Sequence, residues 1–115
     1  MNLGRASSAA LLLSGLAGVV TPRRVATALN LSPESDRGVA ETRAGLGGTY
    51  AALGAWALLS HDAVAQRSVG VRWLGAAAVR LASLALDRPE TDWTFWGYLA
   101  AEVGFGTAAL AFTPT

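Results

Sequence analysis

The sequence predicts an all-α protein, an integral membrane four-helix bundle that occupies residues 1–115 as a single domain. Hydrophobic residues make up 52% of the 115 residues and charged residues only 15%, whereas an ordinary soluble domain carries about 25% charged residues. The apolar residues fall into four runs separated by short polar breaks. A small soluble domain would need more charge to cover its large relative surface. Composition therefore favours a lipid environment.

The first two apolar runs are slightly short for a bilayer unless their helices extend into the flanking residues. These runs cover residues 6–20 and 44–59. A spanning helix needs about 17–25 mostly apolar residues, so we expect spans at about 4–21 and 39–60. Between them, Ser32, Pro33 and Glu34 form a helix-start signal. The signal fits either a short helix at the membrane surface or an early start of the second span.

The other two runs, at 69–86 and 93–112, predict spans at about 69–87 and 92–112. Trp93 and Trp96 open the fourth span, and aromatic rings are typical of the headgroup level. Arginines are slightly more frequent in the first and third polar breaks, which favours a cytoplasmic location for both breaks. These arginines are Arg23, Arg24, Arg37 and Arg88. The pattern predicts a multi-pass protein of the bacterial cytoplasmic (inner) membrane.

Two other interpretations of the runs remain open. A soluble four-helix bundle would show polar residues every three or four positions along each helix, and the second and fourth runs lack them. The first run also resembles a secretory signal peptide, with Arg5 as its basic region, 9–13 as its apolar core and small residues at 15–17 as a cleavage site. Cleavage there would leave three spans.

Charged and polar residues inside the runs predict one polar cluster within the membrane. Arg80 lies about 9 Å inside the third span, and Glu102 lies about 13 Å inside the fourth from the same side, at 1.5 Å per residue. An ionised side chain in hydrocarbon costs several kcal/mol unless it is paired or hydrated, so we expect these two side chains to pair. We expect Tyr98 and Ser83 to add hydrogen bonds. The whole predicted cluster is Glu41, Arg43, Arg80, Ser83, Asp87, Tyr98 and Glu102.

The same cluster has three possible roles. Buried ion pairs often fix how helices pack rather than perform a reaction. Alternatively, the cluster binds a polar headgroup, a quinone or a partner helix. A proton relay is the third role, and it is disfavoured because arginine does not release protons readily. Small residues at helical spacing also predict close helix packing. The positions assigned to that packing are Gly45, Gly48, Ala52 and Gly106.

Several functional classes are disfavoured by the residues present. The chain has no cysteine and one histidine, so we expect neither a disulfide framework nor a metal site. The net charge of +1 gives no nucleic-acid signature. No nucleophile elbow or phosphate-binding loop appears. We therefore expect a non-catalytic protein without a cofactor.

Three landmarks resemble a family of small bacterial four-span membrane proteins of unknown function. They are ETRAGLGG at 41–48, RLASLALD at 80–87, and Glu102. In that family the second span opens with Glu-x-Arg and a double glycine, and the third ends in Arg-x-x-Ser-x-x-x-Asp before glycine and proline. The resemblance covers about 41–110. Here Arg88 replaces the usual glycine, and Leu46 replaces a common aromatic residue.

The family is similar in architecture to DoxX-like proteins and to the sterol-biosynthesis scaffold protein of fungi and animals. The resemblance implies a non-catalytic four-helix membrane module that holds other proteins or a lipid, which is an inference from fold alone.

The expected function is that of a scaffold or accessory subunit. It would bind partner membrane proteins through small-residue helix faces, in a larger membrane-protein complex or a homo-oligomer surrounded by membrane lipids. The alternative is a small lipid- or quinone-binding protein with a polar site at Arg80 and Glu102. A transporter would need an oligomer to build its pathway. A pocket beside Arg80 that the protein's own helices leave unfilled would favour the ligand-binding alternative.

Overall fold

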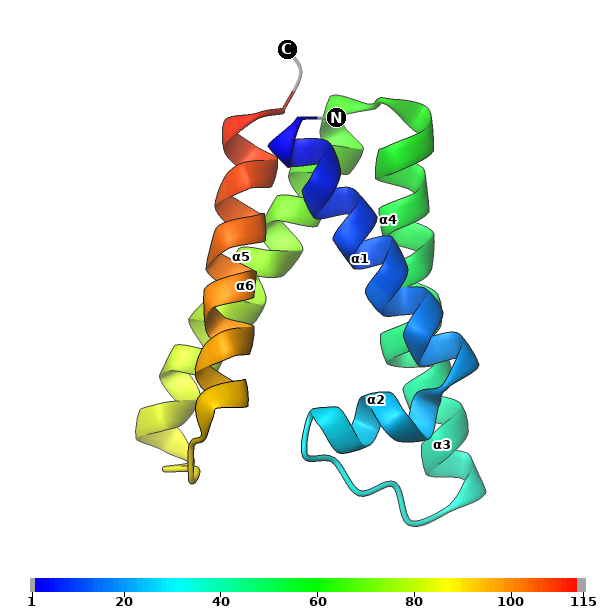
Figure 1. The fold of residues 1–115 in the computed structure, drawn as a ribbon, viewed down its shortest axis with the longest axis vertical. Coiled ribbons are helices and arrows are strands. Elements are labelled where there is room, and N and C mark those ends of the chain that lie inside the picture. Colours follow the sequence, from blue (N-terminus) through cyan, green and yellow to red (C-terminus); the bar gives the residue numbers. More distant parts are fainter. Residues whose placement is uncertain (1, 114–115) are drawn as a thin grey trace.

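The computed structural model describes residues 2–113 and is all-α, with no strand in that part of the chain. Figure 1 shows the helices in order. They are α1 (Leu3–Val20), α2 (Pro22–Ala28), α3 (Asp36–Thr42), a π-helical segment η1 (Arg43–Gly48), α4 (Thr49–Ser60), α5 (Ala63–Leu86) and α6 (Trp93–Ala111). Each of the four predicted spans therefore corresponds to a long helical stretch.

Side-chain caps set where three of the long helices begin. The side chain of Asn2 accepts a hydrogen bond from the Arg5 amide, and that of Asp62 accepts one from the Val64 amide. Asp92 accepts hydrogen bonds from the amides of Thr94 and Phe95. Such caps satisfy amides of the first turn that have no partner within the helix. Because Asp62 caps α5, that helix begins at Ala63, well before the predicted start at residue 69.

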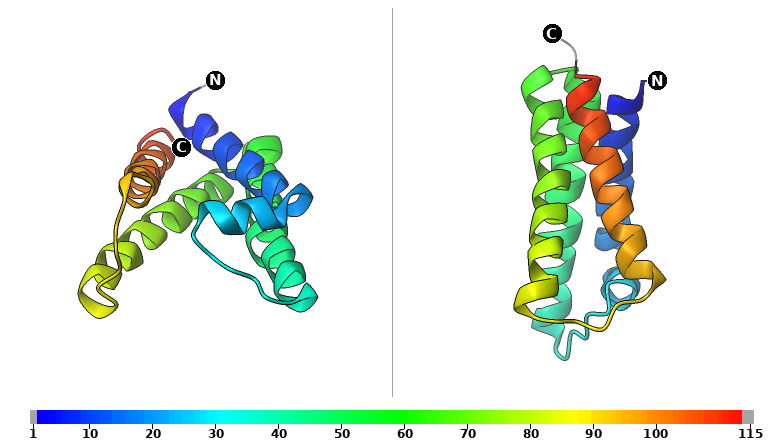
Figure 2. Two further views of the ribbon diagram at one scale, coloured as in Figure 1. Left: turned by 60° about the horizontal axis from the view of Figure 1, so that its bottom comes forward. Right: turned by 90° about the vertical axis from the view of Figure 1, so that its left-hand side faces the viewer.

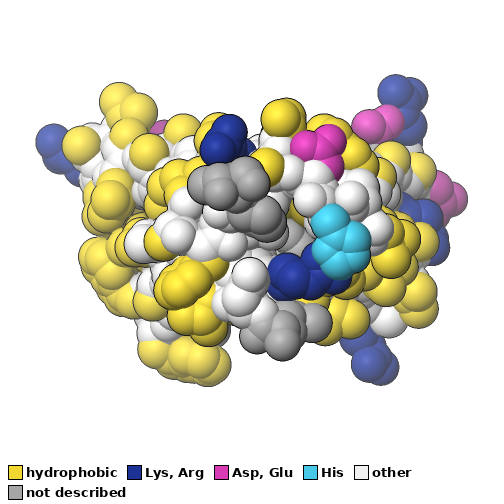
Figure 3. Space-filling model, turned by 90° about the horizontal axis from the view of Figure 1, so that it is seen from above, with side chains coloured by type: hydrophobic (Ala, Val, Ile, Leu, Met, Phe, Trp, Pro, Cys, Tyr) yellow, Lys and Arg dark blue, Asp and Glu magenta, His cyan; other side chains and the backbone are white. Residues whose placement is uncertain are grey.

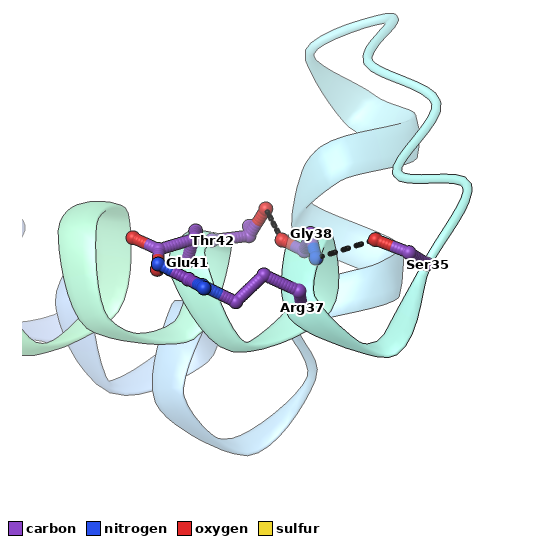
Figure 4. A network of polar contacts seen from close by, with 5 residues as sticks. All are labelled: Ser35, Arg37, Gly38, Glu41 and Thr42. Carbon is purple, nitrogen blue, oxygen red and sulfur yellow. Dashed lines mark hydrogen bonds and ion pairs between the residues drawn. The ribbon is translucent and has the colours of Figure 1, made fainter.

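The second predicted span begins early, in agreement with one of the two interpretations of its helix-start signal. α3, η1 and α4 follow one another without a break, because Thr42 and Gly48 at the junctions keep right-handed helical dihedral angles. The cap is Ser35, which accepts a hydrogen bond from the Gly38 amide at 3.0 Å, and not Ser32 (Figure 4). The short helix α2 was not predicted, although Pro22 stands at its first turn, where proline is favoured.

The four long stretches form two pairs (Figures 1 and 2). α1 packs along η1 and α4, and α5 packs along α6. The pairs meet at the end that holds both termini and the α4–α5 turn, and they diverge towards the other end. There, α2 and the loop that follows it extend from the α1–α4 pair. The molecule is thus V-shaped, with α2 near its open end.

Glycines bring α1 into backbone contact with the helix opposite. A Cβ atom built on Gly15 would lie 2.1 Å from the Ala51 nitrogen, and one built on Gly54 would lie 2.5 Å from the Leu12 nitrogen. Gly18 meets Gly47 in the same way. Such approach is available only to residues without a side chain. Close backbone packing at these glycines therefore holds α1 against η1 and α4 along their length.

The predicted packing face of the second span requires correction. A Cβ on Gly45 would meet nothing within 4 Å, and one on Gly48 would meet only the Arg43 carbonyl at 3.9 Å. Ala52 is exposed. The contact face is the neighbouring one, which carries Gly47 and Gly54, because several small-residue faces run along this helix and spacing alone does not choose between them. Gly106 does pack, against Leu74 of α5.

Small residues are buried where the two pairs meet. Ser7, Ala65 and Ala109 are fully buried near the joined end. Farther along the second pair, Trp73 of α5 and Phe105 of α6 have ring centroids 5.3 Å apart.

Large hydrophobic side chains cover much of the outer surface. Leu59, Leu86 and Trp93 are each more than three-quarters exposed, and Figure 3 shows hydrophobic side chains around the flanks of the molecule seen from the joined end. Two helices, α1 and α5, are long and apolar enough to cross a membrane.

Candidate functional site

A cleft of about 660 Å³ lies between the two helix pairs. Its walls come from both pairs and from α2, and its polar and aromatic residues include Tyr50, Arg72, Trp73, Arg80, Tyr98 and Glu102. Most of the remaining wall is apolar. The volume lies within the range of about 300–1,000 Å³ that is typical of sites for one small molecule. The cleft is therefore an unfilled pocket beside Arg80.

Arg80 and Glu102 form a two-point ion pair on one wall of the cleft. Arg80 Nε lies 2.6 Å from Glu102 Oε1, and Arg80 Nη2 lies 3.1 Å from Oε2. Glu102 is only 5% exposed. The guanidinium also stands 5.2 Å from the ring centroid of Phe95. The predicted pairing is present, and this geometry uses both carboxylate oxygens.

Ser83 and Tyr98 do not bond to that pair as predicted. The Ser83 hydroxyl donates to the Arg80 carbonyl at 2.6 Å, within its own helix. The Tyr98 hydroxyl donates at 2.6 Å to the carbonyl of Ala28, at the end of α2. Because α2 and α6 belong to different halves of the molecule, Tyr98 links the two sides of the cleft near its open end.

Three further residues of the predicted cluster lie elsewhere. Glu41 pairs with Arg37 at 2.8 Å on the exposed face of α3 (Figure 4). Arg43 donates a hydrogen bond to the Val19 carbonyl of α1. Asp87 is exposed at the end of α5. The predicted convergence fails because α3 and η1 pack in the other pair, which has diverged from α5 at this end.

The sequence prediction missed Arg72. Its guanidinium carbon lies 4.1 Å from the ring centroid of Tyr50 and 4.5 Å from that of Trp73. The Arg72 Nη1 and Trp73 Nε1 atoms are buried, and neither has a hydrogen-bond partner among residues 2–113. Trp73 itself is 8% exposed. Two residues of the cleft wall thus each carry a buried donor atom without a hydrogen-bond partner in the described part of the chain.

The reason for missing Arg72 is the position of the helix start. With a span beginning at residue 69, Arg72 would lie at the membrane surface, where arginine is ordinary. With α5 beginning at Ala63, it lies about 14 Å along the helix at 1.5 Å per residue. Asp62 is the residue from which the correct helix start could have been predicted, because aspartate is favoured as a helix N-cap and α5 begins directly after it.

The cleft is electrostatically asymmetric. Arg80 is compensated by Glu102, whereas Arg72 forms no ion pair within the described residues. No group of three or more metal-ligating side chains occurs in the part of the chain that the structure describes. The arrangement suits a molecule with hydrogen-bond acceptor oxygens and an apolar body.

No protein-family model, curated protein or solved structure matches this chain. The family resemblance drawn from the three sequence landmarks remains a prediction, and function is inferred from the cleft.

Proposed function

We propose that the protein is a non-catalytic, multi-pass protein of the bacterial cytoplasmic membrane that binds one amphiphilic molecule, a lipid or a quinone, between its two helix pairs. The observation that carries this proposal is the cleft of about 660 Å³ beside Arg80, which the protein's own helices leave unfilled. A scaffold held together by its helices alone would have no need of such a pocket.

The surface supports the membrane location. Large apolar side chains are exposed along all four helical stretches, and α1 and α5 each qualify as membrane spans by length and composition. The longest dimension of the molecule is 43 Å, and a bilayer with its headgroup regions measures about 40–45 Å. Four helical stretches that run along this dimension would form a four-span bundle that is open on one side.

The lining of the cleft supports an amphiphile in particular. Phe95, Phe105 and Trp73 offer rings to an apolar body, while Arg72 places a guanidinium group in the same wall. Ligand sites commonly combine a mostly apolar wall with a few polar groups that fix orientation.

A scaffold role is the second candidate, and one observation favours it. A Cβ atom built on Gly97 or on Gly104 of α6 would meet nothing within 4 Å, and Ala100 is also exposed. These residues lie near one another on an outward helix face, where a second transmembrane helix could approach closely. The partner would be another membrane protein or a second copy of this chain.

The ligand proposal is tested by filling the cleft with a side chain. Ala76 of α5 lines the cleft, whereas Ala78 on the same helix is exposed and outside it. The intact protein and the variants Ala76→Phe and Ala78→Phe are extracted with their surrounding membrane, and the lipids and quinones that copurify are compared by mass spectrometry. We expect one species to be enriched with the intact protein and Ala78→Phe, and lost with Ala76→Phe. Identical profiles for all three proteins would contradict a cleft ligand.

A further inference from the structure

We infer that the cleft ligand carries an anionic head, a carboxylate or a phosphate, and that Arg72, which lies against the ring of Trp73, binds it. This inference rests on the proposed function and narrows it, because it selects an anionic amphiphile over a neutral quinone. The site it assigns is distinct from the Arg80–Glu102 pair that the sequence predicted.

The three carboxylates of the predicted cluster are not paired with Arg72. Glu102 already binds Arg80 through both of its oxygens. Glu41 is paired with Arg37 on the outer face of α3, and Asp87 is exposed at the far end of α5. Within residues 2–113, no acidic side chain forms an ion pair with Arg72. No ion pair within the described residues therefore compensates the charge of Arg72.

The charge of Arg72 is costly where it lies. Arg72 is partly buried about 14 Å along α5, and its Nη1 atom is inaccessible and unbonded. The rings of Tyr50 and Trp73 face its guanidinium, and such contacts stabilise a cation only partly. Because arginine stays protonated in proteins, the charge cannot be removed by deprotonation. A bound anion would compensate it.

Two unsatisfied donors lie on neighbouring groups. The Arg72 guanidinium lies 4.5 Å from the Trp73 ring centroid, so the buried Nη1 and Nε1 atoms belong to side chains in contact. Both residues line the cleft. A carboxylate or phosphate has at least two acceptor oxygens and a negative charge, so at the cleft wall it can accept hydrogen bonds from the Arg72 guanidinium and compensate its charge. A quinone carbonyl would leave the positive charge uncompensated.

An apolar wall continues from Arg72 along the cleft. Between Arg72 and Arg80, the wall on α5 is formed by Ala76 and Val79, and α6 adds Ala101 and Phe105. A hydrocarbon chain gains free energy from burial along such a wall. The head would therefore lie at Arg72 and the chain would extend along the cleft.

The test compares three sixteen-carbon probes that differ only in the head, and it adds a neutral quinone. The protein is purified in an uncharged detergent, and the affinities of radiolabelled palmitate and hexadecanol are measured at equilibrium, with hexadecyl phosphate and decylubiquinone as competitors. The variant Arg72→Gln removes the charge and keeps a polar side chain. Arg67→Gln is the matched control, because Arg67 is an exposed arginine on the same helix and does not line the cleft.

We expect palmitate or hexadecyl phosphate to bind at least about tenfold more tightly than hexadecanol, which is the size of a charge-assisted hydrogen bond. Arg72→Gln should remove that advantage and leave hexadecanol binding unchanged, and Arg67→Gln should change neither. Dependence on Arg72 for palmitate alone, or for the phosphate alone, would identify which anion is preferred.

Two other outcomes overturn different parts of the proposal. Equal affinity for palmitate and hexadecanol, with no effect of Arg72→Gln, would overturn the anionic head while leaving an amphiphile site intact. Failure of every probe to bind, together with no species lost in Ala76→Phe, would overturn the proposed function itself. Loss of fold is excluded by the melting temperature of the unliganded variant, which we expect to stay level or rise because a poorly compensated charge has been removed.

Discussion

At the level of single residues, two arginines of one helix differ in how their charges are compensated. Arg80 has the carboxylate of Glu102, and Arg72 has only aromatic rings and unbonded donors around it. The Arg80–Glu102 pair could be predicted from the sequence. Helix α5 ends and α6 begins on the same side of the molecule, and the two residues lie at similar depths from that side. The surroundings of Arg72 could not be predicted, because they depend on where α5 begins and on the contact with Tyr50 of the other helix pair.

The Arg80–Glu102 pair yields a prediction about stability. Arg80→Ala leaves Glu102 buried without a partner, and breaking a buried pair in this way costs about 3–5 kcal/mol. We expect a smaller loss here because the Arg80 side chain is still 22% exposed. Adding Glu102→Ala to Arg80→Ala should recover much of the folded yield and melting temperature in detergent. A double variant that is as unstable as the single one would show that the two charges act separately.

Asp92, in the connection that precedes α6, yields a prediction about acid. Its pKa is lowered from the usual value by the hydrogen bond from the Thr94 hydroxyl and by that from the Phe95 amide. A carboxylate with a lower pKa in the folded state contributes stability in full above its unfolded pKa, about 3.9, and loses it as the pH falls through the folded value. Asp92→Asn should therefore be less stable than the intact protein at pH 6, and the gap should close below about pH 4. A gap of constant size between pH 6 and pH 3 would rule out this role.

At the level of helices, the sequence predicts where small residues gather but does not predict which of them touch. Gly45 and Gly47 are two positions apart in a glycine-rich stretch, yet only Gly47 meets the backbone of α1. The π-helical segment η1 adds to the difficulty, because a wider turn shifts which side chains share a face. Register between helices is a property of the packed pair and is not encoded by spacing within one of them.

Substitution of two glycines tests the α1–α4 contact. Gly15→Ala would place a methyl group 2.1 Å from a backbone nitrogen of Ala51, so the two helices must separate. We expect a loss of about 1–3 kcal/mol or more, as overpacking usually costs, seen as a lower melting temperature. Gly45→Ala is the control: its site is open, and alanine's higher helix propensity should make that variant equal to or more stable than the intact protein. Equal destabilisation by both would contradict the assigned face.

At the level of the whole molecule, composition and run length predict the all-α architecture and the order of the long helices. They do not predict the V shape, because it depends on how the two helix pairs pack against each other and not on the pattern within any one helix (Figure 1). The cleft is a consequence of that shape, so it could not be predicted either. The polar positions along each helix indicated only part of its lining.

The absence of cysteine from the sequence allows a direct test of topology. Single cysteines are placed at Ser32, Ser60 and Glu90, which are exposed residues at the three connections between the long helical stretches. A membrane-impermeant maleimide is then applied to intact spheroplasts and to inverted vesicles. If the chain spans four times, residues 32 and 90 should label from one side and residue 60 from the other. Labelling of all three from the same side would contradict the four-span arrangement.

Native mass spectrometry of the intact protein, released gently from its own membranes, shows whether a ligand occupies the cleft. We predict one copy of the chain, or a symmetric oligomer, with one retained amphiphile per chain, and loss of that mass in Ala76→Phe but not in Ala78→Phe. A chain without any retained molecule, bound instead to a second protein in fixed ratio, would contradict ligand binding and favour the scaffold role.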